Sequence, residues 1–499
     1  MPATHILAID QGTTGSTALI LDKRLTVKAK VNQEFRQIFP RPGFVEHDLQ
    51  DIWTSVTDTI RKALRQAGLK GSEIAAIGIT NQRETVGAWD RQTLLPLGHA
   101  IVWQDRRTAS ACQRLRDAGK LPMVRKKTGL VLDPYFSASK MQWMLQRDAR
   151  LHARALAGEV AFGTIDSFLV AKLTGGAAHV TDVSNASRTQ LFDIHKMAWD
   201  DELLALFGVP RPVLPEVRGC SEVYGVTRGL KVLPDGIPVS GMAGDQQAAL
   251  FGQLCFSPGD SKCTYGTGAF LLMNTGGAPV ASKHGLLTTV AWKLGETVTY
   301  ALEGSSFIAG AAVQWLRDGL GIIARSAEVE ALAKSEKSSG GVVFVPALAG
   351  LGAPHWQPHA RGVISGIERG TTRGHLARAT LEGIAFQIFD LAEAMRADAQ
   401  QAIPTFKVDG GASANDLLMQ FQADLLGTRI VRPKMVETTA LGAAFLAGLG
   451  VGMWKNPEAL ARTWKPGRTF TPRMKPEVRA DHLARWRHAV ALASAPSGA

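Results

Sequence analysis

The fold is decided by Ile6-Leu7-Ala8-Ile9-Asp10-Gln11-Gly12-Thr13-Thr14-Gly15-Ser16-Thr17-Ala18-Leu19-Ile20 and by a similar stretch, Lys262-Cys263-Thr264-Tyr265-Gly266-Thr267-Gly268-Ala269-Phe270-Leu271-Leu272. Each predicts a strand, a glycine–threonine turn and a second strand. The glycine lets the backbone approach an anion, the turn exposes N–H groups, and the threonine adds a hydroxyl donor. One such turn is typical of an ordinary β-hairpin. Two of them predict loops that hold a nucleotide polyphosphate from both sides.

The length of the chain predicts more than one hydrophobic core. At 499 residues it is long enough for roughly two to four domains of about 100–200 residues each. Hydrophobic residues make up 45% of the sequence and charged residues 20%, which is typical of a globular chain that buries sizeable cores. We expect two α/β domains, residues 1–245 and 246–499, with a cleft between them.

Local patterns near the N-terminus predict alternating helices and strands. Apolar residues recur at helical spacing from Ile52 to Leu64, and Gly68 is a suitable C-terminal cap for that helix. The apolar run 74–80 is typical of a buried strand. A repeated strand–helix–strand order predicts a mixed or parallel sheet covered by helices.

A similar pattern stands late in the chain. Residues 406–409 predict a strand, Gly410-Gly411 a turn, and residues 415–426 a helix that Gly427 ends. The Gly-Gly turn is either a plain connection or a place where a flat ligand rests on bare backbone near a helix N-terminus.

The charge pattern favours small anionic ligands over nucleic acid. The chain has a formal net charge of +12, but its basic residues are scattered, and the densest short cluster is Arg125-Lys126-Lys127. Proteins that bind nucleic acid concentrate positive charge on one face, so this class is disfavoured. A diffuse positive field still favours an anionic substrate such as ATP.

Cysteine usage and apolar patterning predict a cytoplasmic protein. The four cysteines lie far apart and form no C-x-x-C pair, which is typical of buried thiols in a reducing compartment. The chain begins almost at once with a predicted strand, and we expect no signal peptide. The longest uncharged apolar stretch, 440–454, is shorter than the roughly 20 residues that span a bilayer. We interpret it as a buried helix followed by a turn and expect no membrane insertion.

Two aspartates stand where phosphoryl transfer needs carboxylates. Asp10 ends the first predicted strand before the phosphate turn, where it either caps the turn or holds Mg²⁺. Asp245 follows the apolar strand 239–244 and opens a predicted helix. It is therefore either an N-cap or the general base that accepts a hydroxyl proton. The second hairpin has Thr264 in place of the acid, which suits one nucleotide and one metal ion.

Another set of residues suits a small polyol. Arg83 and Glu84 follow the predicted strand 74–80 and offer donors and acceptors to adjacent hydroxyls. Such a pair is also typical of a surface ion pair of little energetic value. Three aromatic residues are candidates for apolar walls of this site, or for ordinary core positions: Trp103, Tyr135 and Phe270.

The motifs resemble those of the FGGY carbohydrate kinases, within the sugar kinase, actin and heat-shock ATPase superfamily, and most closely the glycerol-phosphorylating branch of that family. The resemblance runs from the first strand to about Trp454. It rests on Asp10-Gln11-Gly12-Thr13-Thr14, Gly78-Ile79-Thr80-Asn81-Gln82-Arg83-Glu84-Thr85, Asp133-Pro134-Tyr135-Phe136-Ser137, Val180-Thr181-Asp182-Val183-Ser184-Asn185-Ala186-Ser187-Arg188-Thr189, Gly244-Asp245-Gln246-Gln247-Ala248, Tyr265-Gly266-Thr267-Gly268 and Gly350-Leu351-Gly352-Ala353-Pro354.

This resemblance implies two ribonuclease H-like (actin-like ATPase) domains with a central cleft. It implies transfer of the γ-phosphoryl group of MgATP to the terminal hydroxyl of glycerol, giving sn-glycerol 3-phosphate and ADP, by a homodimer or homotetramer. Asp245 would be the general base. The polyol would be bound by Arg83, Glu84, Trp103, Tyr135, Asp245, Gln246 and Phe270. The nucleotide would be bound by Thr13, Thr14, Gly15, Thr267, Gly310, Gln314, Gly411 and Asn415, and the metal ion by Asp10.

The sequence departs from the family pattern in two places. Many members of that branch continue the first turn as Ser-Ser-Arg, whereas this chain has Gly15-Ser16-Thr17, so an arginine contact to the nucleotide phosphates is missing. The segment 225–238 does not match the loop associated with inhibition by fructose 1,6-bisphosphate, and it contains no histidine. We therefore predict that neither this inhibition nor control by histidine phosphorylation operates.

Two alternative functions stay open from the sequence. One is a kinase of the same fold that acts on a tetritol, dihydroxyacetone or a ketopentose. The other is an ATP-dependent conformational switch in which hydrolysis drives partner binding. The acceptor residues Arg83, Glu84, Tyr135 and Asp245 disfavour the switch, because a pure ATPase has no use for them.

Overall fold

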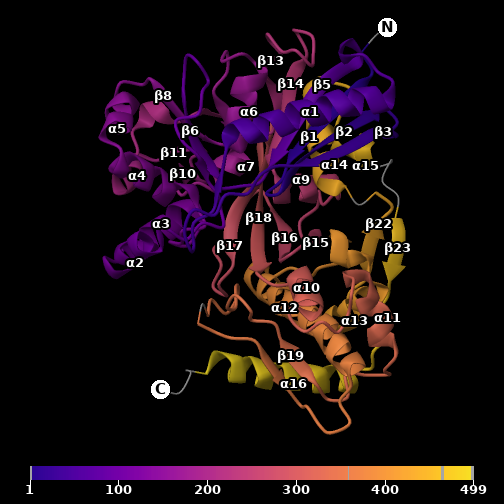
Figure 1. Ribbon diagram of the computed structural model, residues 1–499. Helices are drawn as coiled ribbons and strands as arrows, with labels where there is room; N and C mark the ends of the chain where they lie inside the picture. The colour runs from indigo at the N-terminus through magenta and orange to yellow at the C-terminus, as the bar shows by residue number, and fades with distance from the viewer. Residues whose placement is uncertain (1–2, 358, 436, 462–465, 496–499) are drawn as a thin grey trace.

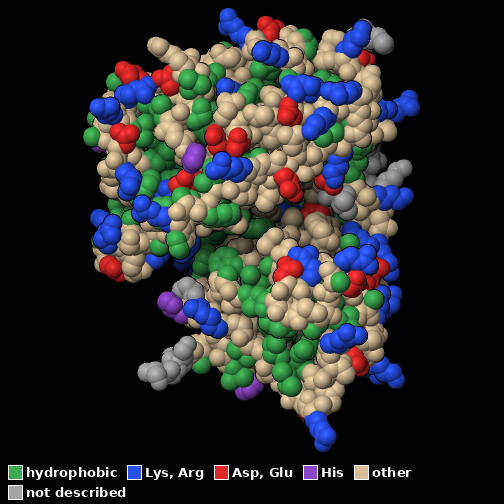
Figure 2. All heavy atoms as spheres, viewed as in Figure 1, with side chains coloured by type: hydrophobic (Ala, Val, Ile, Leu, Met, Phe, Trp, Pro, Cys, Tyr) green, Lys and Arg blue, Asp and Glu red, His purple; other side chains and the backbone are tan. Residues whose placement is uncertain are grey.

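Two mixed sheets with related strand topologies form the cores of two lobes (Figure 1), and the face in Figure 2 is hollowed between them. The computed structural model describes residues 3–357, 359–435, 437–461 and 466–495. In the first sheet an antiparallel meander of three strands is extended by two strands parallel to the first. The strand order is β13 (Ser221–Val226), β14 (Pro238–Gly244), β5 (Ile74–Asn81), β1 (His5–Gln11), β2 (Gly15–Asp22) and β3 (Val27–Glu34).

The second sheet repeats this plan. Its meander is β15, β16 and β18, and β21 and β22 extend it in parallel from β15. The strand order is β17 (Leu287–Leu294), β18 (Thr297–Ser306), β16 (Ala269–Gly276), β15 (Ser261–Tyr265), β21 (Phe406–Asp409), β22 (Ile430–Pro433) and β23 (Pro466–Phe470). The two hairpins expected from the sequence are therefore confirmed as the first two strands of each meander.

Helices cover both faces of the first sheet. On one face α1 (Leu49–Ala67) packs against β2 and β3. Asp48 caps its N-terminus, and Gly68 ends it at a φ of 66°, as the sequence predicts. The other helices of this lobe are α2 (Ala109–Asp117), α3 (Leu121–Thr128), α4 (Ser137–Arg147), α5 (Ala149–Leu156), α6 (Ile165–Leu173), α7 (Val183–Ala186) and α8 (Asp201–Phe207).

A smaller subdomain is inserted in the first lobe beside the main sheet, on the left of Figure 1. Its four-stranded sheet is formed by β4 (Glu46–His47), β7 (Ala100–Ile101), β6 (Val86–Asp90) and β8 (Val160–Thr164). Two short strand pairs accompany it: β9 (Val180–Asp182) with β12 (Glu216–Arg218), and β10 (Phe192–Asp193) with β11 (Ala198–Trp199). The loop after β5 enters this subdomain and carries Arg83 and Glu84.

The second lobe is built around α12 (Arg373–Ala399), whose apolar residues pack into the larger core together with α13 (Asp416–Leu426) and α16 (Pro476–Ser494). The pair β19 (Val343–Val345) and β20 (Val363–Ser365) lies next to α16. The remaining helices of this lobe are α10 (Gly310–Asp318) and α11 (Val329–Lys334). In the described residues, no helix is long and apolar enough to cross a membrane.

Two helices in close contact join the lobes: α9 (Asp245–Gly252) and α14 (Thr438–Gly450). A short helix, α15 (Pro457–Ala461), follows α14. Although α14 comes late in the chain, it packs on β14, β5 and β1 and lies beside the N-terminal strands in Figure 1. A Cβ at Gly442 would lie 1.9 Å from the Ala248 carbonyl oxygen, so only glycine permits this crossing. The boundary expected after residue 245 falls where β14 meets α9.

Candidate active site

A backbone hydrogen bond closes each of the two predicted phosphate turns, across three residues in the first turn and across two in the second. The Gly12 N–H donates to the Gly15 carbonyl at 2.9 Å, and the Gly266 N–H donates to the Gly268 carbonyl at 2.8 Å. Both turns expose their tips, with Thr14 and Thr267 open to solvent. Each turn therefore offers the combination of exposed backbone and hydroxyl donors that suits a phosphate group.

The second turn is supported by the start of α10. The Gly310 N–H donates to the Gly266 carbonyl at 2.9 Å, and the Ala311 N–H donates to the Thr267 carbonyl at 3.0 Å. A Cβ at Gly310 would lie 2.6 Å from the Gly266 oxygen, so glycine is required for this approach. Gln314 lies one turn further along α10 with an exposed side chain.

A cavity of about 620 Å³ opens where the ends of β1, β15 and β21 meet the start of α14. The first lobe contributes Asp10, and the second lobe contributes Thr264 and Gly410-Gly411. The remaining lining residues are Asp409, Ser413, Ala414, Arg432, Glu437, Thr438 and Thr439. The strands that lead into both phosphate turns thus end at one cavity, which is the arrangement expected for a nucleotide gripped from two sides.

Bare backbone forms one wall of this cavity. Gly410 has a φ of 82°, and a Cβ there would lie 2.6 Å from the Tyr265 carbonyl oxygen. A Cβ at Gly411 would meet no protein atom within 4 Å, so its position faces open space. Asn415 caps α13 by accepting from the Leu418 N–H at 2.9 Å. Its side chain therefore has a local structural partner beside the site.

The surroundings of Asp10 disfavour the ionised form of its carboxyl group. Burial, followed by the neighbouring carboxylates of Asp245 and Glu437, raises its pKa to about 7, while the Lys30 ammonium opposes this shift. A carboxylate held close to other acids at a phosphate site fits Mg²⁺, which binds through one or two carboxylates, waters and substrate phosphates. The proximity of Asp10 and Asp245 also places the cavity next to the polar network described below.

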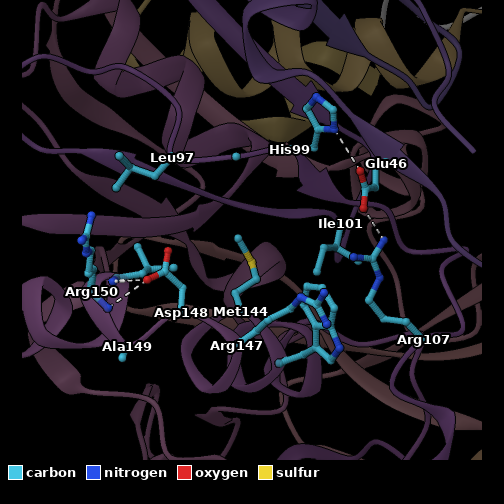
Figure 3. A pocket seen from close by; sticks show the side chains of 13 residues that line it. Glu46, Leu97, His99, Ile101, Arg107, Met144, Arg147, Asp148, Ala149 and Arg150 are labelled. Atoms are coloured by element: carbon cyan, nitrogen blue, oxygen red, sulfur yellow. Dashed lines mark hydrogen bonds and ion pairs between the residues drawn. The ribbon is translucent and has the colours of Figure 1, made fainter. Parts of the chain in front are cut away.

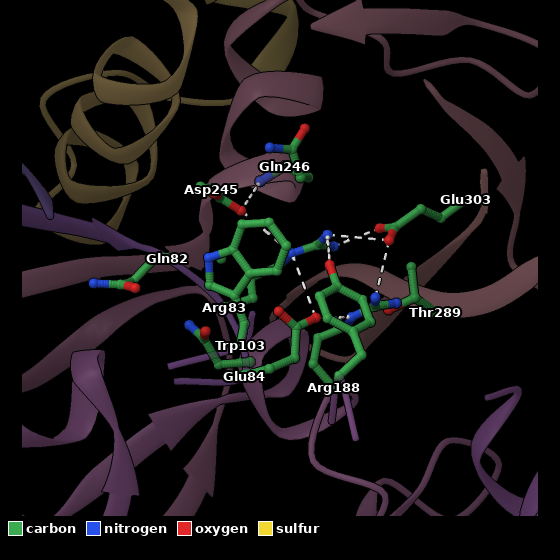
Figure 4. A network of polar contacts seen from close by, with 12 residues as sticks. Gln82, Arg83, Glu84, Trp103, Arg188, Asp245, Gln246, Thr289 and Glu303 are labelled. Carbon is green, nitrogen blue, oxygen red and sulfur yellow. Dashed lines mark hydrogen bonds and ion pairs between the residues drawn. The ribbon is translucent and has the colours of Figure 1, made fainter. Parts of the chain in front are cut away.

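Arg83 lies at the centre of a buried charge network between the lobes (Figure 4). Its guanidinium donates two hydrogen bonds to Glu303, the one from Nη2 to Oε1 being 3.0 Å long. Nη2 also donates to the Tyr135 hydroxyl at 3.3 Å, and Nη1 donates to Gln247 Oε1 at 3.2 Å. The side chains of Arg83 and Glu84 are only 2% and 1% exposed, so the alternative of a surface ion pair is wrong.

Arg188 is the second guanidinium of this network. It donates to Glu84 Oε1 at 2.7 Å and to Glu303 Oε1 at 2.9 Å. Burial opposes ionisation of Glu303, but Arg188 and Arg83 outweigh it and hold the pKa at about 2. Since Glu303 lies on β18 and both arginines lie in the first lobe, the network links the two lobes.

Asp245 is the member of the network that reaches open space. Its side chain is 29% exposed, and Oδ1 lies 3.2 Å from Arg83 Nε. Oδ1 also accepts from the Gln246 N–H at 2.7 Å, while Gly244 occupies the N-cap position of α9. Burial raises the pKa of Asp245, and Arg83 and Lys262 moderate the rise. An accessible carboxylate with a raised pKa suits proton abstraction.

The predicted aromatic wall spans the cleft. The Trp103 ring makes edge contacts with Tyr135 at 5.6 Å and with Phe270 at 6.4 Å between centroids. Trp103 Nε1 also donates to Thr13 Oγ1 at 2.9 Å. The indole therefore connects the polyol side to the first phosphate turn, a link that the sequence did not predict.

Three buried charged residues of this region were not predicted as candidate site residues: Arg188, Lys262 and Glu303. The Lys262 ammonium is buried and donates to Gln246 Oε1 and to Thr264 Oγ1, the latter at 2.9 Å. Glu303 directly follows the apolar run Tyr300-Ala301-Leu302, and Lys262 lies between Ser261 and Cys263 on a buried strand. A charge isolated in a buried strand was the available signal, because such a group requires a partner.

A second cavity of about 520 Å³ lies in the subdomain of the first lobe (Figure 3). Three of its polar and charged side chains pair with one another: His99 Nδ1 lies 2.9 Å from Glu46 Oε2, and Arg107 Nη2 donates to Glu46 Oε1 at 2.7 Å. Arg107 is also sandwiched between Phe44 and Trp143. These contacts hold parts of the subdomain together.

Family models agree with this geometry. The N-terminal domain of the FGGY family of carbohydrate kinases matches residues 5–252, and the C-terminal domain of that family matches residues 261–451. The chain belongs to the FGGY family of carbohydrate kinases. The two family domains correspond to the two lobes, and the short interval between them follows α9.

Relatives within the FGGY family match the chain almost from end to end. A glycerol kinase of Myxococcus xanthus is 64% identical over 490 residues, which cover 98% of this chain and 99% of that protein. A glycerol kinase of Bdellovibrio bacteriovorus is 55% identical, with 98% and 99% covered. The crystal structure of Plasmodium falciparum glycerol kinase with ADP matches with a TM-score of 0.92 at 36% identity, covering 98% of each chain. The prediction of two actin-like ATPase domains is confirmed.

Proposed function

We propose that this FGGY kinase phosphorylates glycerol with ATP, giving sn-glycerol 3-phosphate and ADP. The observation that carries the proposal is the place of Asp245. It is the solvent-accessible carboxylate of a buried polar network, and it lies close enough to Asp10 to raise the pKa of that nucleotide-side group. The names of the full-length relatives, which are glycerol kinases, support the choice of acceptor.

The residues that would contact the polyol have different roles. Arg83 and Glu84 would bind adjacent hydroxyls, with Gln246 and the Tyr135 hydroxyl beside them. Trp103 and Phe270 would pack against the carbon edge of a three-carbon substrate. Asp245 would accept the proton of the terminal hydroxyl as that oxygen attacks the γ-phosphorus, and the proton remains on the carboxyl group as ADP departs.

The nucleotide side supplies position and charge compensation. Thr13, Thr14, Gly15 and Thr267 would contact the phosphates, Gly310 and Gln314 would line the nucleotide, and Gly411 and Asn415 would lie against the adenosine. Asp10 would hold Mg²⁺, which when bound neutralises charge on the phosphate oxygens. Closure of the lobes would exclude water, which otherwise competes with the polyol for the phosphoryl group. From the family resemblance we also propose a cytoplasmic homodimer or homotetramer.

A panel of acceptors tests the proposed function. ADP release would be measured with glycerol, dihydroxyacetone, erythritol, xylulose and no acceptor. We expect the largest kcat/KM for glycerol and slow release without acceptor. A larger kcat/KM for xylulose than for glycerol would show that the substrate is a different one. A rate of ADP release that does not depend on the acceptor would favour an ATP-driven conformational switch.

A further inference from the structure

The nucleotide cavity is poor in positive charge for a site that binds a polyphosphate. Its described lining contains Asp10, Asp409 and Glu437 but a single cation, Arg432. Arg432 is engaged with its surroundings, because it donates to the Ser413 carbonyl at 2.6 Å and to Asp416 Oδ1 at 3.0 Å. Apart from a metal ion held by Asp10, a cation that binds the phosphates would therefore come from outside this lining.

The first phosphate turn does not supply this cation. Residues 11–17 contain no Lys or Arg, and the Thr17 hydroxyl accepts from Asn32 Nδ2 at 3.0 Å. Thr17 pairs with Asp10 on one side and with Asn32 on the other, so the three side chains lie in one row on the same face of the sheet.

Lys30 lies on that face, two residues before Asn32 on β3. Lys30 is therefore the diagonal neighbour of Thr17 on the adjacent strand. Diagonal neighbours on antiparallel strands are about 7–8 Å apart, which a long side chain can span. Its ammonium forms an ion pair with Glu437, which lines the cavity, and its charge acts on Asp10. The lysine therefore extends from the outer strand toward the mouth of the nucleotide cavity.

The ion pair between Lys30 and Glu437 is weak enough for the ammonium to bind a phosphate group instead. The two side chains are 44% and 34% exposed, and ion pairs between exposed groups are weak. A polyphosphate carries more negative charge than one carboxylate and offers several acceptor oxygens. It can displace Glu437 from the ammonium at little cost.

We propose that Lys30 is a cation that binds the nucleotide phosphates in this chain. Glu437 holds the ammonium before the nucleotide arrives and releases it on binding. This inference rests on the proposed function, which assigns the cavity to ATP. It concerns affinity for phosphate groups and gives Lys30 no part in proton transfer.

The test compares two lysines of the same strand. Lys30→Met removes the ammonium and keeps the apolar stem, while Lys28→Met is the matched control, since Lys28 pairs with Asp22 at 3.1 Å on the sheet edge. Binding of ADP and of adenosine would be measured by calorimetry in metal-free buffer. We expect Lys30→Met to weaken ADP binding about tenfold and to leave adenosine binding unchanged. Lys28→Met should stay within about twofold of the parent for both ligands.

A double variant tests whether a positive charge introduced nearby restores ADP binding. Thr17→Arg added to Lys30→Met should restore ADP binding to within about threefold of the parent, because the new guanidinium lies in the row beside Asp10. Unchanged ADP binding in Lys30→Met, equal losses of ADP and adenosine, or no recovery in the double variant would each overturn the inference. A parent protein that binds neither ligand, in metal-free buffer or with Mg²⁺ added, would instead refute the proposed function.

Discussion

The polyol side and the nucleotide side of the cleft are built from different materials. The polyol side consists of buried side chains whose charges pair across the lobes, with Arg83 and Glu303 at its centre. The nucleotide side consists largely of turns and bare backbone around an open cavity, as at Gly410-Gly411. The first recognises its ligand through the identity of side chains, and the second through the space that missing side chains leave. A substitution on one side should therefore change the binding or turnover of that side's ligand and leave the other ligand's binding unchanged.

Asp245→Asn should produce the largest difference between the effect on turnover and the effect on ADP binding. The amide cannot accept the hydroxyl proton, so we expect kcat to fall by about 10³, within the range of general-base catalysis. ADP affinity should stay within about twofold of the parent, because Asp245 belongs to the polyol side. Steady-state kinetics and calorimetric ADP binding check both parts. Glycerol phosphorylation at the parent rate would remove Asp245 from the role of base.

Glu303→Gln should damage stability and the polyol side together. It leaves Arg83 and Arg188 without their shared carboxylate, and loss of one partner in a buried network costs roughly 3 kcal/mol of unfolding free energy. Glycerol KM should rise with it. Chemical denaturation followed by tryptophan fluorescence gives the measurement. Glu296→Gln is the control, since that side chain is 99% exposed on the β17–β18 turn; equal stability of the two variants would contradict a buried network.

Gly411→Ala should act on the nucleotide side alone. The new methyl group meets no protein atom within 4 Å, so any loss of ADP affinity must come from contact with the ligand. We expect ADP binding to weaken about fivefold, roughly 1 kcal/mol, with stability and glycerol KM unchanged. Gly370→Ala, also without a protein neighbour within 4 Å, is the matched control. ADP binding equal to that of the control would place the nucleotide elsewhere.

The pH dependence of turnover should give the smallest and most graded effect. Asp245 acts in its ionised form, and burial raises its pKa above the ordinary value of 3.8. Activity is therefore complete above the raised pKa and is lost as the pH falls through it. A profile of kcat/KM for glycerol should show an acid limb whose apparent pKa lies above 3.8. A limb at or below that value would mean that the base is a different group.

The same contrast explains what the sequence could predict. The turns, the end of α1 at Gly68 and the Gly410-Gly411 connection follow from neighbours in sequence, because glycine and capping residues act locally. Glu303 and Arg188 could not be assigned roles, since their partners lie more than a hundred residues away. The buried helix within 440–454 is confirmed as part of α14. Its packing against the N-terminal sheet is a tertiary contact that its sequence does not encode.

The central claim is that turns from both lobes hold one polyphosphate while Asp245 faces the acceptor hydroxyl. A crystal structure with a non-hydrolysable ATP analogue and glycerol tests it most directly. We predict phosphate oxygens in contact with the Thr13-Thr14 turn and with Thr267, and a terminal glycerol hydroxyl within hydrogen-bond distance of Asp245. Phosphates bound at only one turn, or glycerol bound away from Asp245, would contradict the account.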